Sequence, residues 1–162
     1  MLKKAQNIGQ IFIYILSIVV VGVILLFGYQ AITNFSKNAD RIALVQFQKD
    51  LESSIKSISS QYGAIQKKIF SLSNDYKQVC FVDNYNSITD LNAMDSYPII
   101  KDSVVSGTGK NIFLVKANKQ AAESFSIEKI ALKTVIFDCF NITNSKLTIR
   151  IEGMGDHAVI SK

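Results

Sequence analysis

Apolar residues run almost without interruption from residue 8 to residue 29, inside a longer segment, 5–36, that has no formally charged residue. A helix needs about 20 apolar residues to cross the hydrocarbon core of a bilayer. A secretory signal peptide has a shorter apolar region followed by a small-x-small cleavage site, and no such site follows Tyr29. The pattern therefore predicts a transmembrane helix that stays attached to the chain.

Beyond this span, apolar residues recur at steps of three and four, which is the period of an amphipathic helix. Because the only proline is Pro98, nothing prevents the helix from continuing out of the membrane to about Tyr62. Gly63 is the expected stop. The apolar stripe that this helix is expected to bury comprises Leu44, Phe47, Leu51, Ile55, Ile58, Tyr62 and Ile65.

After Gly63 the pattern changes to short apolar runs separated by polar turns, which is typical of strands. In the last run Leu147, Ile149 and Ile151 alternate with polar residues, so one face of this strand is expected to be buried. We expect it to form a hairpin with the run before it, through the turn-forming residues 141–145. The predicted strands are 68–72, 79–83, 112–116, 124–128, 134–140 and 146–152.

A helix with one apolar stripe and a sheet with one apolar face can bury each other. The expected fold is therefore α+β, with one long N-terminal helix, half transmembrane and half amphipathic, packed on an antiparallel β-sheet. We expect a short basic leader at residues 1–5, a transmembrane helix at 6–35 and one domain at 36–162. In that domain the helix should cover about 36–62 and the strands about 68–152.

The charge distribution bears on partners and orientation. The formal net charge is +5 over 162 residues, and the basic residues are dispersed rather than clustered with aromatic ones. This argues against nucleic acid as a partner. Lys3, Lys4 and the α-amino group directly precede the span, whereas Lys37, Asp40 and Arg41 behind it partly cancel. Basic residues alone, which the positive-inside rule counts, are close in number on the two sides, so the orientation rests on the position of Lys3 and Lys4 next to the membrane. We expect a single-pass protein of the cytoplasmic membrane, with its N-terminus in the cytoplasm and its C-terminal domain outside.

The chain has two cysteines, Cys80 and Cys139, in separate apolar runs. Neither has a second cysteine or a histidine at the spacing of a metal site. An even number of cysteines in an exported domain predicts one disulfide between them. The alternative is two buried free thiols.

Residues with the chemistry of a catalytic or cofactor site are sparse. His157 is the only histidine and supplies at most one member of a triad or metal site. The sequence Gly107-Thr108-Gly109 lacks the third glycine of a nucleotide-binding fingerprint and is interpreted as a turn. No pair of acidic residues is spaced as a general acid and base. We therefore predict a protein that is not an enzyme and that uses no metal or cofactor.

Two tripeptides match the acceptor pattern for N-glycosylation, at Asn34 and at Asn141. Asn141 lies in a predicted turn and would be accessible outside the cell. Asn34 lies very close to the bilayer, where a transferase has poor access. The alternative for both is the chance occurrence of a common tripeptide.

The residues Lys3-Lys4-Ala5-Gln6 ahead of the apolar run, together with the expected helix-on-sheet layout, resemble the type IV pilin-like proteins, in particular archaeal prepilins and archaellins. Such precursors carry a short basic leader, a class III signal peptide, that a prepilin peptidase cuts in front of the apolar segment. The resemblance implies cleavage between Ala5 and Gln6. It covers about residues 3–32 and the general layout of the rest.

The same resemblance implies that subunits pack against one another through the N-terminal helix. The core of a filament would then contain Gln10, Ile11, Val20 and Phe27. Many members of the family have a glutamate at the position of Gln10, where its carboxylate neutralises the terminal amine of a neighbouring subunit. Glutamine can form hydrogen bonds there but cannot neutralise a charge. The difference is therefore expected to weaken assembly of subunits rather than insertion into the membrane.

Two functions follow from these observations. The first is a structural subunit of a pilus-like or archaellum-like surface filament, inserted in the membrane before assembly and surrounded first by lipid and then by copies of itself. The alternative is a single-pass anchor that never polymerises and that displays a binding or scaffold domain outside the membrane.

Overall fold

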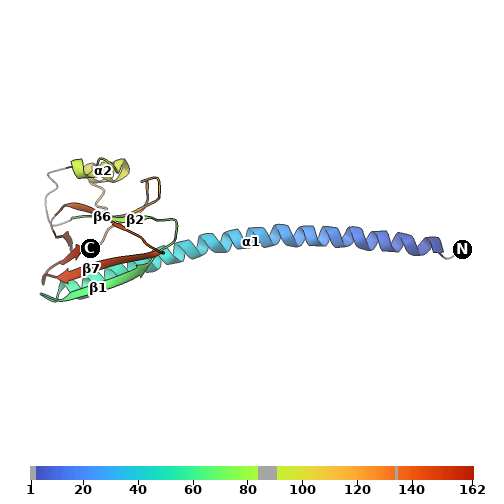
Figure 1. The fold of residues 1–162 in the computed structure, drawn as a ribbon, viewed down its shortest axis with the longest axis horizontal. Coiled ribbons are helices and arrows are strands. Elements are labelled where there is room, and N and C mark those ends of the chain that lie inside the picture. The colour runs from blue at the N-terminus through green and yellow to red at the C-terminus, as the bar shows by residue number, and fades with distance from the viewer. Residues whose placement is uncertain (1–2, 84–90, 134) are drawn as a thin grey trace. The chain divides into compact units, whose positions relative to one another are not determined.

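The computed structural model describes residues 3–83, 91–133 and 135–162, without the side chains of residues 3–10, 34, 36 and 37. A long helix, α1 (Lys3–Ser59), precedes eight strands, and the chain divides into two compact units, 1–41 and 42–162. Figure 1 shows the strands of the second unit against the C-terminal part of α1. The predicted α+β fold, with a long N-terminal helix packed on β-structure, is confirmed.

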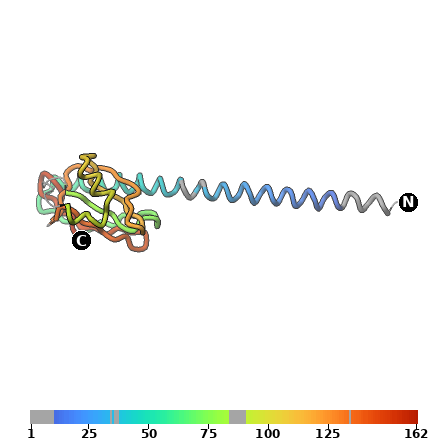
Figure 2. The backbone as a smooth tube through the Cα atoms, turned by 90° about the horizontal axis from the view of Figure 1, so that it is seen from above, coloured from blue at the N-terminus to red at the C-terminus, as the bar shows by residue number. Residues whose placement is uncertain are grey.

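The second unit also contains a 3₁₀ helix and a short α-helix between the second and third strands. Figure 2 follows the chain through this unit from the end of α1 to the C-terminus. The elements after α1 are β1 (Ile65–Ser71), β2 (Gln78–Val82), η1 (Asn92–Met94), α2 (Pro98–Val105), β3 (Ile112–Val115), β4 (Ala121–Phe125), β5 (Ile130–Leu132), β6 (Phe137–Asn141), β7 (Lys146–Gly153) and β8 (Ala158–Ser161).

The strands form two four-stranded sheets. Sheet A has the order β1-β7-β8-β5, and sheet B has the order β4-β3-β2-β6. All neighbouring strands are antiparallel except β5 and β8, which are parallel. The expectation of a single antiparallel sheet is therefore corrected to two sheets, one of them mixed.

The main core lies between the apolar face of α1 and the inward faces of both sheets. Four residues of the predicted stripe, Phe47, Leu51, Ile55 and Ile58, are buried, and Leu44 packs against them. On β7 the predicted alternation is also confirmed, because Leu147, Ile149 and Ile151 are fully buried between exposed or half-buried neighbours. The apolar stripe of α1 and the alternating apolar residues of β7 thus pack against each other in one core.

The prediction that the last two residues of the stripe, Tyr62 and Ile65, are buried on the helix is wrong. α1 ends at Ser59 rather than at Tyr62, and the chain turns through Gly63, whose φ of 77° is left-handed. Tyr62 and Ile65 consequently lie outside the helix and are 82% and 51% exposed. The turn lets Ile65 begin β1 opposite Glu152 of β7.

The predicted hairpin between the runs 134–140 and 146–152 is wrong. β6 pairs with β2 in sheet B, and β7 pairs with β1 and β8 in sheet A. Residues 142–145 carry the chain from one sheet to the other, with Asn144 and Ser145 at positive φ. Residue 134 lies outside the described residues. The predicted strand at 124–128 is shifted to β4, and the sequence analysis missed β5, β8 and α2.

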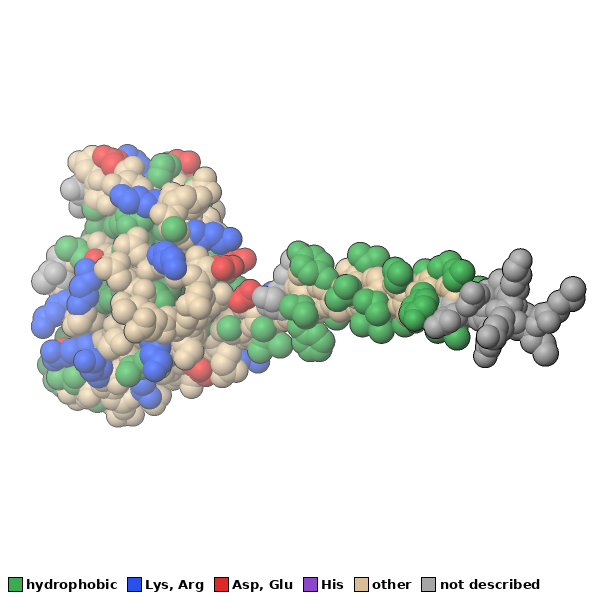
Figure 3. All heavy atoms as spheres, turned by 45° about the vertical axis from the view of Figure 1, so that its right-hand side comes forward, with side chains coloured by type: hydrophobic (Ala, Val, Ile, Leu, Met, Phe, Trp, Pro, Cys, Tyr) green, Lys and Arg blue, Asp and Glu red, His purple; other side chains and the backbone are tan. Residues whose placement is uncertain are grey.

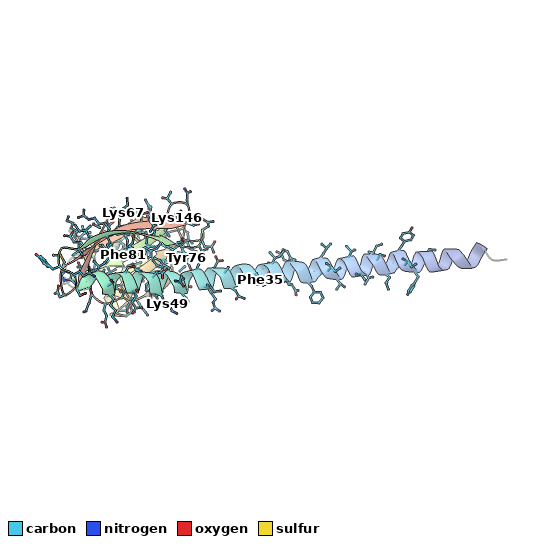
Figure 4. All side chains as sticks on the ribbon, turned by 90° about the horizontal axis from the view of Figure 1, so that it is seen from below. Phe35, Lys49, Lys67, Tyr76, Phe81 and Lys146 are labelled. Atoms are coloured by element: carbon cyan, nitrogen blue, oxygen red, sulfur yellow. A yellow bond between two sulfur atoms is a disulfide. The ribbon has the colours of Figure 1, made fainter. Side chains whose placement is uncertain are left out.

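A second, smaller core lies on the other face of sheet B, beneath η1 and α2. Its buried members include Cys80, Met94, Ile100 and Phe113. Figure 1 shows α2 across β2 and β6 from the side that faces α1, and Figure 4 shows Phe81 in the interior of the domain. Sheet B is therefore covered on both faces, which explains why all four residues of β3 are buried.

Candidate membrane-embedded site

The apolar segment of α1 exposes its side chains on every face of the helix. Within it Ile11 is 58%, Val20 is 48% and Phe27 is 68% exposed. Its most apolar window of 18 residues has no buried side chain, and the helix is long and apolar enough to cross a membrane. Figure 3 shows hydrophobic side chains covering this segment. Water is a poor solvent for such a surface, so the segment requires an apolar environment.

Two hydroxyl groups of the uncharged run form hydrogen bonds within the helix, which is compatible with that environment. The Ser17 hydroxyl donates a hydrogen bond to the backbone oxygen of Ile13 over 2.8 Å, so its proton is satisfied within the helix itself. Near the end of the segment, the Thr33 hydroxyl donates to the backbone oxygen of Gln30 over 2.9 Å. A Cβ atom at Gly22 or at Gly28 would meet no atom within 4 Å. The helix therefore leaves both glycines open to a neighbour.

The predicted processing and assembly residues all lie on α1. Ala5, Gln6 and Gln10 belong to its first turns, but their side chains lie outside the described residues. Ile11 and Phe27 are sixteen residues apart along the helix, or about 24 Å. The structure therefore arranges these residues along a rod and does not bring them into one cluster.

The predicted disulfide is confirmed. Cys80 on β2 is directly opposite Cys139 on β6, the two sulfur atoms are bonded, and the Cα atoms are 4.0 Å apart. This close approach is typical of a non-hydrogen-bonded antiparallel pair. The alternative of two free thiols is thereby excluded, and the bond ties together the two strands that support the smaller core.

Of the two candidate glycosylation sites, the structure describes the side chain of Asn141 but not that of Asn34. Asn141 ends β6, is exposed, and accepts a hydrogen bond at its side-chain oxygen from the Gln78 amide over 2.9 Å. Its amide nitrogen is the atom that would carry a glycan. The side chain of Asn34 lies outside the described residues.

His157 lines a shallow cavity of about 380 Å³ formed by residues of β5, β7 and β8 and of the turn between β7 and β8, with Lys133, Glu152 and Met154. Its Nδ1 is 2.6 Å from a carboxylate oxygen of Asp156. This hydrogen bond, more than the neighbouring charge, lowers the pKa of Asp156 from its ordinary value. Among the described residues, no three histidine, cysteine or acidic side chains are grouped as metal ligands.

Buried Asn111 is a residue that the sequence analysis missed. Its side-chain oxygen accepts a hydrogen bond from the backbone NH of Ile127 over 2.9 Å, and its amide donates to the oxygen of Ile127 over 2.7 Å. Asn111 is only 1% exposed. The signal in the sequence was an asparagine next to an apolar run, which is equally typical of a turn.

Comparisons with family models, with curated proteins and with solved structures found no match to this chain. The functional interpretation therefore depends on the sequence and on the geometry described above.

Proposed function

We propose that this protein is a structural subunit of a pilus-like or archaellum-like surface filament, held in the membrane by its N-terminal helix before assembly. The observation that supports the proposal is the apolar segment of α1, which exposes large side chains around its whole circumference. It is joined to a domain that buries its own core. A segment of this kind can be surrounded first by lipid and later by the helices of other copies.

The sequence ahead of the segment supports the same proposal. Lys3-Lys4-Ala5-Gln6 resembles the leader of archaeal prepilins, so a prepilin peptidase would cut between Ala5 and Gln6 and release the helix for assembly. Under this proposal the N-terminus is cytoplasmic and the domain lies outside the cytoplasmic membrane. The disulfide between Cys80 and Cys139 is consistent with an oxidising compartment.

The second candidate function is a single-pass anchor that displays its domain and never polymerises. The observation that favours it is Gln10, because a glutamine cannot neutralise the terminal amine of a neighbouring subunit. Lipid alone can also surround the exposed apolar side chains of the helix, without any other subunit. The two functions differ only in what surrounds residues 11–27 after the protein matures.

Crosslinking within the membrane segment distinguishes them. A photoreactive residue in place of Val20 should crosslink to a second copy of the chain in material sheared from the cell surface, and electron microscopy of that material should show filaments that contain the chain. Crosslinks to lipid alone, with no filament at the surface, would establish the anchor instead. Mass spectrometry of the mature N-terminus tests processing separately. A chain that still begins at Met1 in cells with an active peptidase would remove the support from the leader.

A further inference from the structure

The face of sheet A that points away from α1 carries a cluster of positive charge. We call this the outer face and define it by Ile65, Lys67 and Ile69 of β1 and Lys146, Thr148, Arg150 and Glu152 of β7. These residues alternate with the buried positions of β7 and are paired across the two strands. Figure 4 shows Lys67 and Lys146 on the side of the domain opposite Lys49, which lies on α1.

Two of the cations are held directly opposite each other. Lys67 of β1 is in register with Arg150 of β7, and like charges at such positions repel. Among the residues that the structure describes, the one acidic side chain paired with either is Glu152, whose oxygen is 3.6 Å from a terminal nitrogen of Arg150. Within the described part of the chain, Lys67 and Lys146 are in no ion pair. Glu152 offsets part of this repulsion, but three cations against one carboxylate leave the outer face with a net positive charge that favours an anion.

Arg150 has further capacity for hydrogen bonding. Its Nε is buried and has no hydrogen-bond partner among the described residues, although 42% of the side chain is exposed. A guanidinium group binds phosphate and carboxylate through several donors at once. Because Nε is buried, the donors available to an anion at the outer face are those on the exposed part of the guanidinium group.

The cations alternate with exposed apolar side chains. Ile69 is 63% exposed and Ile65 is 51% exposed, on either side of Lys67 along β1. None of the seven residues that define the outer face is aromatic, so they offer no ring on which a base or a sugar could stack. A surface with aliphatic side chains between lysine and arginine is suited to the headgroup region of an anionic bilayer, where both kinds of side chain find partners.

We propose that the outer face of sheet A is a docking surface for anionic phospholipid, with Lys67, Lys146 and Arg150 binding phosphate groups and Ile65 and Ile69 entering the headgroup region. This interaction goes beyond the proposed function, because it requires a folded domain and a bilayer but no filament. It gives the domain a reversible contact with a membrane surface in addition to the apolar helix.

Vesicle binding by the full chain tests this proposal. The chain is reconstituted in nanodiscs of neutral phosphatidylcholine, so that its apolar helix is already embedded. The nanodiscs are then mixed with vesicles of phosphatidylcholine, alone or with phosphatidylglycerol. We expect binding only to the vesicles with phosphatidylglycerol, and weaker binding at high salt.

Matched variants locate the contact. Lys67→Gln, Lys146→Gln and Arg150→Gln together should weaken binding about a hundredfold, because each positive charge near an anionic surface contributes about fivefold. The control replaces Lys49, Lys56 and Lys110 by glutamine, which removes the same charge from exposed positions elsewhere, and it should bind nearly as the parent chain does. Ile65→Ser with Ile69→Ser should also weaken binding to vesicles. Near-UV circular dichroism establishes that each variant is folded.

Three results would overturn the proposal. The first is no binding by the folded parent chain. The second is an equal loss in both triple variants, which would mean that net charge alone attracts the vesicles. The third is binding to soluble dextran sulfate but not to vesicles, which would assign the outer face to an anionic polymer. Each result leaves the filament proposal intact, since that proposal is tested by crosslinking at residue 20.

Discussion

The backbone oxygen of Ile58, at the end of α1, lies so close to Gly153 of β7 that a Cβ atom at residue 153 would be 2.1 Å from it. The backbone oxygen of Gln61 would be 2.3 Å from the same atom. Beside this contact, the NH of Gly63 donates to the oxygen of Gly153, and the NH of Gly153 donates to the oxygen of Ala64, both over 2.8 Å. The end of the helix thus packs directly on the backbone of the strand.

Gly153→Ala should therefore destabilise the domain. The two oxygens belong to the backbone and cannot rotate away, so α1 would have to shift on β7. We expect a loss of at least about 3 kcal/mol in the free energy of unfolding, at the upper end of overpacking effects. Urea denaturation followed by near-UV circular dichroism measures it. Gly28→Ala is the control, because it meets open space in a helix and should leave the domain unchanged. Equal stability of the two variants would contradict the close packing.

The sequence could predict those elements whose pattern is local. The steps of three and four from Leu44 to Ile58 describe the buried face of α1, and the alternation along β7 describes the buried face of sheet A. The disulfide was predictable because the chain offers only one pairing. Likewise, the apolar segment was evident because its length alone matches a bilayer.

Strand pairing was less predictable because it depends on distant parts of the chain. β6 and β7 are adjacent in sequence, yet their partners, β2 and β1, lie far earlier. β4 ends at Phe125 because the side chain of Asn111 takes up the backbone hydrogen bonds of Ile127. α2 was missed because its eight residues are too few to show a helical period, although proline is common at the start of a helix.

For the candidate membrane-embedded site, the sequence predicted the extent of the apolar segment but not the roles of individual residues within it. Composition identified the apolar helix but singled out none of its faces, because every face of the helix is apolar. The cationic outer face was also missed, because Lys67 and Arg150 become neighbours only through the register of β1 and β7.

The disulfide should contribute much of the stability of the domain. Cys80 and Cys139 are separated by 59 residues, and the loop-entropy model gives about 4 kcal/mol for a loop of that size. Replacing both by alanine, or reducing the bond, should lower the free energy of unfolding by about that amount. The measurement is urea denaturation with and without a reductant. If the reductant changes the parent chain by less than about 1 kcal/mol, the bond does not constrain the unfolded state as the model requires.

Asn111→Ala should be more harmful than its polar side chain suggests. The substitution leaves the NH and the oxygen of Ile127 buried without the hydrogen bonds that Asn111 supplies, which should cost about 3 kcal/mol. Asn118→Ala is the control, because Asn118 is exposed and its side-chain hydrogen bonds within the described part of the chain are to Gln120. That change should stay within about 0.5 kcal/mol. A similar cost for the two variants would mean that water replaces the buried amide.

The pair of Asp156 and His157 predicts a small dependence of stability on acid. Because the hydrogen bond with His157 lowers the pKa of Asp156 in the folded chain, the contact stabilises the fold above the ordinary carboxyl pKa. That contribution is lost as the pH falls through the lowered value. In His157→Gln the pKa of Asp156 should rise toward its ordinary value, as measured by carboxyl carbon NMR. An unchanged pKa in the variant would assign the shift to another group.

Val20→Asp tests whether the apolar segment of α1 packs in a filament core. Val20 lies near the middle of the uncharged run and is 48% exposed on the helix. In a filament core an aspartate there would be buried without a partner, which is costly, so fibres should disappear. One aspartate at the centre of a span raises the free energy of membrane insertion by about 3 kcal/mol. Each of the many Ile, Val, Leu and Phe residues lowers it by about 0.3 to 0.6 kcal/mol. The chain should therefore still enter the membrane.

The domain should be unaffected by this substitution, because residue 20 belongs to a different compact unit from the core. The expected result is thus a chain in the membrane fraction, with its disulfide formed and its domain resistant to protease, but with no fibres at the cell surface. Val20→Ala is the control and should assemble, since alanine adds no charge. Fibres formed by Val20→Asp would show that residue 20 lies outside the packed core. Loss of fibres in Val20→Ala would instead attribute assembly to the shape of the valine side chain rather than to the absence of charge.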